Sequence, residues 1–197
     1  MHGLINRSIE CFLRDLYGHE VWASVASAAE FRSDSFEAVA NYDDALTDLI
    51  LAAASQKLGK PVPDILEDIG TYLVSHQNRE SLRRLLRFGG ATFIEFLHSL
   101  DELHERAKLA VPDLDLPVLE LCDHSQGGFT LFCGEGQTGF DHVLVGVLRA
   151  MADDYGALVL LEYLGGNSGR AAISIQLLET RFAQGKTFDL TTSLGAT

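Results

Sequence analysis

The sequence predicts an α+β fold, in which a helical N-terminal part is followed by a small antiparallel sheet with one intervening helix. Apolar residues recur every three or four positions over the first 110 residues, as they do in amphipathic helices. After Pro117 the pattern changes to short apolar runs separated by glycine-containing turns, which is typical of antiparallel strands. One further stretch with helical spacing lies among those runs. Helices followed by strands in this order indicate the α+β class.

The composition indicates one globular domain with an acidic surface. The apolar content of 47% can form a sizeable core, and 28 acidic against 15 basic residues give a net charge of −13. Such a surface repels phosphate backbones and anionic lipid, so no nucleic-acid partner is expected. No apolar run reaches the roughly 18–20 residues of a membrane span. Three widely spaced cysteines are typical of a reducing cytoplasm and not of a disulfide framework.

Helices are expected where the apolar spacing is bounded by start and stop signals. In residues 1–18, apolar side chains repeat at helical spacing until Gly18. The stretch 43–59 opens with two acidic residues, which favour a helix start, and it ends at Gly59. The other helices of the N-terminal part are expected over residues 19–31, 64–77, 81–88 and 91–110.

The C-terminal part is expected to contain two pairs of strands and a helix. Residues 118–124 and 127–135 indicate two strands that are joined by a turn at Gln126 to Gly128. A helix over residues 139–156 follows. Residues 157–166 and 170–179 then indicate a hairpin around the sequence GGNSG. We therefore expect one domain over residues 1–184 and a C-terminal tail over residues 185–197.

Two histidines occur six positions apart in the helix that is expected over residues 91–110. Counting back from His104 by one and two turns gives Leu100 and Leu97, so His104 lies on the apolar stripe. His98 shares its side of the helix with acidic residues and is expected to be solvated. A histidine on an apolar face is either a packed core residue or a metal ligand, and this helix alone leaves both readings open.

Three stretches carry a resemblance to a known family. Residues 1–18 are similar to the opening helix of the H-NOX (haem-nitric oxide/oxygen binding) family, which includes the haem sensor domain of soluble guanylate cyclase. Residues 64–73, DILEDIGTYL, are similar to the segment that ends at the family's helix glycine. Residues 88–104, FGGATFIEFLHSLDELH, resemble the helix that ends in the proximal histidine. The likeness covers about residues 1–180, and the order of helices and strands also agrees.

By this resemblance His104 is the proximal ligand of the iron of haem b, Leu100 lines the pocket, and Pro117 presses against the porphyrin. A neutral imidazole on a dry stripe can bind iron without competition from water. Asp101 and Glu105 lie within one turn of His104, and either of them could orient its other ring nitrogen.

One motif departs from the family. H-NOX proteins hold the haem propionates with a Tyr-x-Ser-x-Arg motif, in which two hydroxyls and an arginine meet two carboxylates. With Gly139 and Gly146 as anchors, this motif falls on Cys133, Glu135 and Gln137, so no cation remains. Repulsion between Glu135 and the propionates would cost roughly 1–4 kcal/mol of binding free energy. Burial of the apolar faces of the macrocycle contributes at most roughly 10 kcal/mol in its favour. Haem binding is weakened but not excluded. Other basic residues that could meet a propionate are Arg83, Arg84 and Arg87.

The expected distal pocket contains no hydrogen-bond donor. By the same alignment, the tyrosine of oxygen-binding members falls on Val143. The other lining residues are Ile5, Ile9, Leu73 and Val147. Bound dioxygen needs a donor, whereas NO binds ferrous iron firmly without one. The resemblance therefore implies a five-coordinate ferrous haem that takes NO and CO and discriminates against oxygen. A register shift of one position would instead place His142 in the pocket.

The leading interpretation is a haem-binding nitric oxide sensor without enzyme activity. By the resemblance, NO would release His104 from the iron, and the change would pass to a signalling partner such as a histidine kinase or a diguanylate cyclase. The alternative is a haem-free interaction domain, whose cavity is empty or holds another hydrophobic ligand. No P-loop, HExxH, CxxC or GxSxG motif indicates catalysis. A separate metal-site hypothesis involves Cys122, Asp123, His124 and Cys133.

Overall fold

A computed structural model describes residues 1–77, 80–136, 138–167 and 170–186. Its helices are α1 (Gly3–Tyr17), α2 (His19–Ala28), α3 (Asp44–Leu58), α4 (Val62–Ser75), α5 (Glu80–Arg87), α6 (Phe93–His98), α7 (Leu103–Ala110) and α8 (Phe140–Tyr155), with short 3-10 turns η2 (Ser99–Glu102) and η3 (Ser125–Gly127). Its strands are β1 (Leu119–Asp123), β2 (Gly128–Cys133), β3 (Leu158–Asn167) and β4 (Arg170–Glu179).

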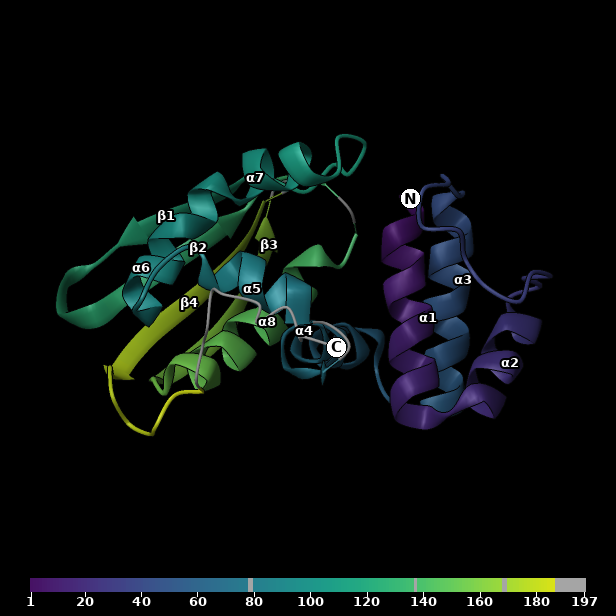
Figure 1. The fold of residues 1–197 in the computed structure, drawn as a ribbon, viewed down its shortest axis with the longest axis horizontal. Helices are drawn as coiled ribbons and strands as arrows, with labels where there is room; N and C mark the ends of the chain where they lie inside the picture. The colour runs from purple at the N-terminus through teal and green to yellow at the C-terminus, as the bar shows by residue number, and fades with distance from the viewer. Residues whose placement is uncertain (78–79, 137, 168–169, 187–197) are drawn as a thin grey trace, which may run out of the picture.

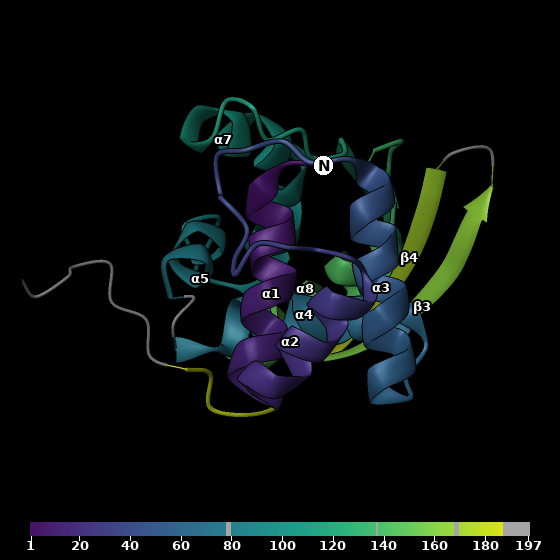
Figure 2. The ribbon, with the colours of Figure 1, turned by 90° about the vertical axis from the view of Figure 1, so that its right-hand side faces the viewer.

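Helices α1, α2 and α3 pack together at one end of the molecule, and the sheet lies at the other end with α5, α6 and α7 (Figure 1). Helices α4 and α8 lie between these two groups (Figure 1). Seen from the helical end, α1, α2 and α3 stand in front of the sheet (Figure 2). The sheet is antiparallel, and its strand order is β1-β2-β4-β3. This architecture confirms the α+β class predicted from the sequence.

Each group of elements has its own apolar core. The helical core joins α1 to α4 and includes Phe12 and Ile65, which are fully buried. The sheet core joins the strands to α6 and α8 and includes Leu100, Leu148 and Ile173, also fully buried. Burial of one large apolar side chain stabilises a fold by roughly 1.5–3 kcal/mol. Two well-filled cores therefore hold the two groups as separately packed units that meet at α4 and α8.

Helix ends coincide with capping signals that can be read in the sequence. The Asp43 carboxylate accepts a hydrogen bond from the Ala45 amide at 3.0 Å and begins α3, and Gly59 ends this helix with a φ of 66°. Thr92 and Glu95 form a capping box at the start of α6. Because such signals are local, the predicted bounds of α3, α8 and β4 agree with the observed bounds to within one residue.

The helix predicted over residues 91–110 is interrupted, so the prediction of one continuous helix was wrong. Its middle turn is the 3-10 segment η2, which separates α6 from α7. The Arg106 guanidinium donates to the Ser99 carbonyl at 3.2 Å, and the Leu103 amide bonds the Leu100 carbonyl, three residues back. His104 thus lies two residues after a tightened turn.

Helices α4 and α8 cross at unusually short range because glycine faces backbone at the crossing. A Cβ atom on Gly70 would lie 2.0 Å from the Val143 carbonyl oxygen, and one on Gly146 would lie 1.9 Å from the Glu67 carbonyl oxygen. No side chain fits at either position without separating the helices. The two cores are therefore joined through a direct backbone contact between α4 and α8.

The start of the predicted tail is attached to the domain. The Phe182 amide donates to the Gly156 carbonyl at 2.8 Å, and the Lys186 amide donates to the Asp154 carbonyl at 2.9 Å. The rest of the predicted tail, residues 187–197, lies outside the described residues.

A buried carboxylate ties α1 to the loop before α3. Glu10 is fully buried, and it accepts hydrogen bonds from Arg14 at 2.7 Å, from Arg7 at 2.9 Å and from the Phe36 amide at 2.9 Å. The Ser35 hydroxyl donates at 3.1 Å to the same oxygen, Oε2, that accepts the Phe36 amide, whereas both arginines bond Oε1. Burial by itself raises the pKa of Glu10, but the Phe36 amide and the two arginines outweigh it and hold the pKa below the usual 4.5.

We expect Glu10→Gln to lower the free energy of unfolding by about 2 kcal/mol at pH 7. Because the folded-state pKa is depressed, this stabilisation is fully present above the unfolded-state pKa and is lost as the pH falls through the folded-state pKa. The difference between wild type and variant should therefore shrink below about pH 4.5. Urea unfolding at pH 7 and pH 4 measures it. Glu179→Gln, at the exposed end of β4, is the control and should change little; an equal Glu10→Gln effect at both pH values would contradict the assignment.

Candidate functional site

His104 lies in the first turn of α7, and its side chain is 14% exposed. Its Nδ1 is 2.5 Å from the carbonyl oxygen of Leu116, in the segment that leads to β1. A carbonyl oxygen can only accept, so Nδ1 carries the proton and donates it. The neutral ring then has its lone pair on Nε2, which is the nitrogen available to a metal.

The residue that orients the ring was not foreseen. The sequence pointed to Asp101 or Glu105, but the Asp101 carboxylate accepts the Leu121 amide of β1 at 2.8 Å. The Glu105 carboxylate is 3.8 Å from Nε2 of His104, beyond hydrogen-bond range, and this side chain is 80% exposed. A backbone carbonyl twelve residues away performs this role, and a main-chain acceptor leaves no signal in a sequence.

The surroundings of His104 on the sheet side are apolar. Leu100, one turn earlier, is fully buried in the sheet core, and Leu116 packs against that core. Pro117 is buried and lies against Gly136, where an added Cβ would be 2.5 Å from the proline Cγ. The hydrogen bond to Leu116 therefore joins His104 to a segment that packs on the sheet core and whose Pro117 contacts the loop after β2.

The residues predicted for the distal side come from α1, α4 and α8. Ile9, Leu73 and Val143 all take part in the helical core, whereas Val147 packs against the sheet core and Ile5 is half-buried. Three of these five residues thus belong to one core, the helical one.

The neighbouring histidine on α8 points elsewhere. The His142 ring packs against the Tyr163 ring with centroids 4.5 Å apart, and its Nδ1 is 3.9 Å from the Glu67 carboxylate. Val143, and not His142, therefore joins the helical core.

Two of the residues that were aligned with the Tyr-x-Ser-x-Arg motif, Cys133 and Glu135, border a cavity of about 380 Å³. Cys133 is buried at the end of β2, Glu135 is exposed, and Gln137 lies outside the described residues. Asp141 and Arg170 also line this cavity, and neither was singled out by sequence reasoning. Arg170 is brought there by the pairing of β2 with β4, which no local motif encodes.

Two titratable groups near this cavity, the Cys133 thiol and the Tyr163 hydroxyl, have raised pKa values and are neutral at pH 7. Burial, with a smaller contribution from the Asp141 carboxylate, raises the pKa of the Cys133 thiol to about 11. The Tyr163 hydroxyl donates to Asp141 at 2.6 Å, and this hydrogen bond, followed by burial, raises the pKa of Tyr163 to about 12. Neither group supplies positive charge for a carboxylate ligand.

The other arginines considered for this role lie elsewhere. The Arg83 Nε is 2.8 Å and the Arg87 Nη1 is 3.5 Å from the carboxylate oxygens of Asp154, near the end of α8. Arg84 forms a surface pair with Glu80 at 3.4 Å. None of the three lines the 380 Å³ cavity.

The structure gives no support to the separate Cys/His metal site. In the sheet register Cys122 faces Thr130 and Cys133 faces Leu119, so the two thiols are about 10 Å apart along the ladder. No group of three His, Cys, Asp or Glu side chains among the described residues is arranged to hold a metal ion. His98, predicted to be solvated, is 52% exposed, and its Nε2 is 3.5 Å from the Asp123 carboxylate.

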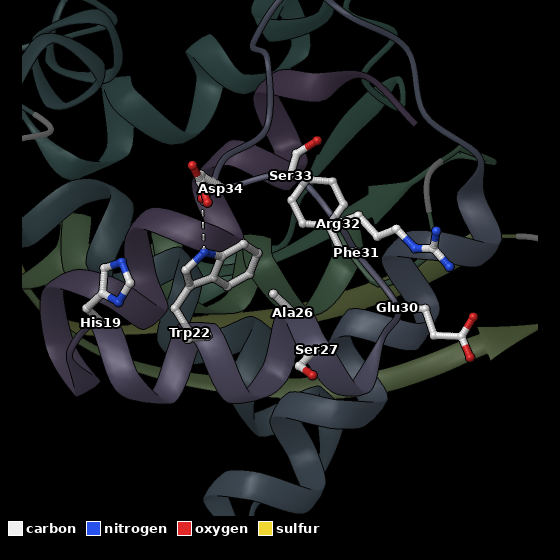
Figure 3. Close-up of a pocket in the computed structure, with 10 residues that line it drawn as sticks. His19, Trp22, Ala26, Ser27, Glu30, Phe31, Arg32, Ser33 and Asp34 are labelled. Carbon is white, nitrogen blue, oxygen red and sulfur yellow. Dashed lines mark hydrogen bonds between the residues drawn. The ribbon is translucent and has the colours of Figure 1, made fainter.

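A larger cavity, of about 610 Å³, lies between α2 and the loop at residues 30–34 (Figure 3). Figure 3 shows the indole of Trp22 beneath the loop, with its N–H directed to the Asp34 carbonyl at 3.5 Å. Its lining contains no residue of α6, α7 or the sheet. This cavity is therefore separate from the surroundings of His104.

The fold and the site define a class of protein: an α+β domain in which one imidazole lies beside an apolar core with its Nδ1 bonded to a main-chain carbonyl. The sequence profile of the family described as Haem-NO-binding (HNOB) matches residues 2–162. The chain therefore belongs to this family, whose domains are called H-NOX, and the resemblance noted in the sequence is confirmed.

The relatives of this chain include soluble guanylate cyclases. Soluble guanylate cyclase gcy-31 of Caenorhabditis elegans is 29% identical over 155 residues, which is 78% of this chain and 22% of that protein. Soluble guanylate cyclase 89Db of Drosophila melanogaster is 24% identical over 164 residues, which is 83% of this chain and 24% of that protein. The chain thus spans less than a quarter of the length of these relatives, and the part it covers is the H-NOX sensor domain.

Solved H-NOX structures share the fold. An oxygen-binding H-NOX domain related to soluble guanylate cyclases, solved as its oxygen complex, superposes with a TM-score of 0.71 at 20% identity, over 95% of this chain and all of that one. A variant H-NOX protein from K. algicida in the Fe(II) unliganded state has a TM-score of 0.78 at 17% identity, over 91% of this chain and 97% of that one. Within the described part of the chain, no helix is both long and apolar enough to cross a membrane.

A haem fits some of these residues and not others. The free Nε2 of His104 and the apolar side chains around it suit an iron ligand and the faces of a macrocycle. The end of the site near Glu135 does not suit the propionates, because the described part of the motif supplies neither a cation nor a hydroxyl. His104 therefore agrees with the family's ligand to the iron, whereas the residues near Glu135 do not agree with the family's propionate-binding motif.

Proposed function

We propose that this chain is the haem-binding sensor of a diatomic gas, with His104 as the axial ligand of haem b. The observation that carries the proposal is the hydrogen bond from His104 Nδ1 to the Leu116 carbonyl, since it fixes the tautomer in which Nε2 can ligate. The haem would supply ferrous iron that binds the gas. Leu100 and Pro117 would then pack beside it.

Nitric oxide is the ligand that we propose, with CO as a second one. The distal residues Ile5, Ile9, Leu73, Val143 and Val147 have no hydrogen-bond donor, and the ring of His142 lies against Tyr163. A bound oxygen would therefore find no donor among them to stabilise its partial negative charge. This selectivity distinguishes our proposal from the oxygen complex of the structural neighbour.

A movement of His104 can reach the neighbourhood of β1 by two routes. One runs along the backbone through η2, and the other runs through the hydrogen bond to Leu116. The tightened turn η2 ends two residues before His104, and its Asp101 holds β1 through the Leu121 amide. The Leu116 carbonyl links His104 to the segment before β1. We propose that the sheet end near β1 relays the signal to a cytoplasmic partner, such as a histidine kinase, a diguanylate cyclase or, as in the relatives, a guanylate cyclase.

The test is the absorption spectrum of protein purified from cells that are supplied with haem. The ferrous protein should show the Soret band of a five-coordinate haem, which shifts when NO or CO is added and stays unchanged in air-saturated buffer on the timescale of mixing. A stable oxygen complex would contradict the selectivity. A colourless protein that ignores added hemin would contradict haem binding itself.

The colourless outcome would favour the second candidate function, a haem-free interaction domain. The observation in favour of this alternative is the replacement of the propionate motif by the buried thiol of Cys133 and the carboxylate of Glu135. In that case the apolar site would be filled by side chains or would hold another hydrophobic ligand.

A further inference from the structure

The 380 Å³ cavity adjoins the surroundings of His104. It lies where β2 ends, α8 begins and the β3–β4 hairpin closes, and it is lined by Cys133, Gly134, Glu135, Gly136, Thr138, Gly139, Asp141, Gly166, Arg170 and Ala171. Gly136 contacts Pro117, and the residue before Pro117 accepts the hydrogen bond from His104. A macrocycle bound at His104 would therefore direct its carboxyl groups toward this cavity if it lies as the motif alignment implies.

The charge of the cavity is unsuited to a carboxylate. Its lining contains the carboxylates of Glu135 and Asp141. Asp141 already accepts the Tyr163 hydroxyl at 2.6 Å and the His142 amide at 3.0 Å, so its carboxylate is held in place. The thiol of Cys133 is neutral, because its pKa is raised to about 11. An incoming anion would meet like charge at this end.

The one cation among the described lining residues, Arg170, already has partners. Arg170 is paired with Glu120, and its guanidinium stacks on the Phe132 ring at 4.4 Å. Phe132 and Cys133 are successive residues of β2, so their side chains point to opposite faces of the sheet. Arg170 is therefore held at the face opposite to the buried thiol.

We propose that this cavity selects against ionised carboxyl groups, so that the chain binds an iron porphyrin more tightly when its two carboxyl groups are neutral. The inference rests on the proposed function, because it needs a porphyrin bound through His104. Unpaired carboxylates lose hydration on entering the cavity and gain no cation there, whereas esterified or protonated carboxyls carry no such penalty.

The experiment titrates the haem-free protein with hemin and, separately, with hemin dimethyl ester in the same mixed solvent, and follows the Soret band of the bound form. We expect the ester to bind about tenfold more tightly than hemin. Glu135→Gln and Asp141→Asn should each tighten hemin by about threefold and leave the ester unchanged. Glu162→Gln removes one exposed carboxylate of β3 outside the cavity, and it should change neither affinity.

The variants distinguish an effect of charge from the greater hydrophobicity of the ester. The ester is equally apolar in every variant, so only an effect of charge can change the ratio of the two affinities. The inference would be overturned if Glu135→Gln tightened hemin and the ester equally, or if hemin bound more tightly than the ester. Either result would leave the proposed function intact. An Arg170→Gln variant that weakens hemin but not the ester would also overturn it, since Arg170 would then bind the carboxylates. If neither porphyrin gives a Soret band that depends on His104, the proposed function fails, and the inference fails with it.

Discussion

His104→Gly is expected to lose the Soret band of the histidine-ligated haem, and added imidazole should restore it. The substitution removes the ligand and leaves a gap of about one imidazole beside Leu116, whose carbonyl can again accept a ring N–H. Loss of the ligand itself should weaken haem binding by more than the roughly 10–100-fold that accompanies loss of an orienting partner. Hemin titrations with and without imidazole, followed by absorption, measure both effects.

His98→Gly is the matched control. It removes an imidazole six residues earlier, but that ring is 52% exposed and faces Asp123 and the edge of the Phe129 ring. The spectrum of this variant should match that of the wild type. If His98→Gly and His104→Gly lose the band alike while far-UV circular dichroism shows both folded, the assignment of the axial ligand is wrong.

Asp154→Ala is expected to have the largest effect on stability, about 3–5 kcal/mol. The carboxylate is 1% exposed and lies between Arg83 and Arg87, whose side chains are 14% and 12% exposed. Its removal takes this carboxylate away from two largely buried guanidinium groups. Burial makes this costly, because charge that is removed from water must be compensated by a partner. Urea unfolding at pH 7 gives the difference in free energy.

The neighbouring Asp153→Ala removes the same chemical group from an exposed position of α8, and its cost should stay within about 0.5 kcal/mol. A cost for Asp154→Ala as small as this would show that the pairing with α5 contributes little.

The expected loss has a structural consequence as well. Arg87 stacks on the Tyr155 ring at 3.9 Å, and the Tyr155 hydroxyl donates to the Gly90 carbonyl at 2.8 Å. The buried pair therefore also positions the turn that leads into α6.

The departure at the propionate motif separates two properties that haem proteins usually combine. In our proposal, ligation depends on the His104 imidazole, which is hydrogen-bonded to the Leu116 carbonyl. Retention depends also on the carboxylate end, where the cavity presents Glu135 and Asp141. If haem binds as we propose, its affinity should therefore be limited by charge at the rim and not by the ligand to iron.

The sequence by itself determined the elements and their order. Gly18, Gly59 and Gly156 end helices where they were expected to, and Asp43 begins one, because a cap depends on a few adjacent residues. The alternation of apolar residues placed β4 correctly. The apolar stripe placed His104 beside the core, and the motif around it identified the family, which the profile match confirms.

Only the tertiary structure decided what those residues contact. The proton donor role of His104 Nδ1 depends on the carbonyl of Leu116, and the break at η2 occurs where Arg106 reaches back to the Ser99 carbonyl. The position of Arg170 beside the cavity depends on the pairing of two strands that are nearly forty residues apart. Periodicity and capping act over a few residues, whereas these contacts join distant segments whose spacing is set by packing. A single sequence carries no separate record of them.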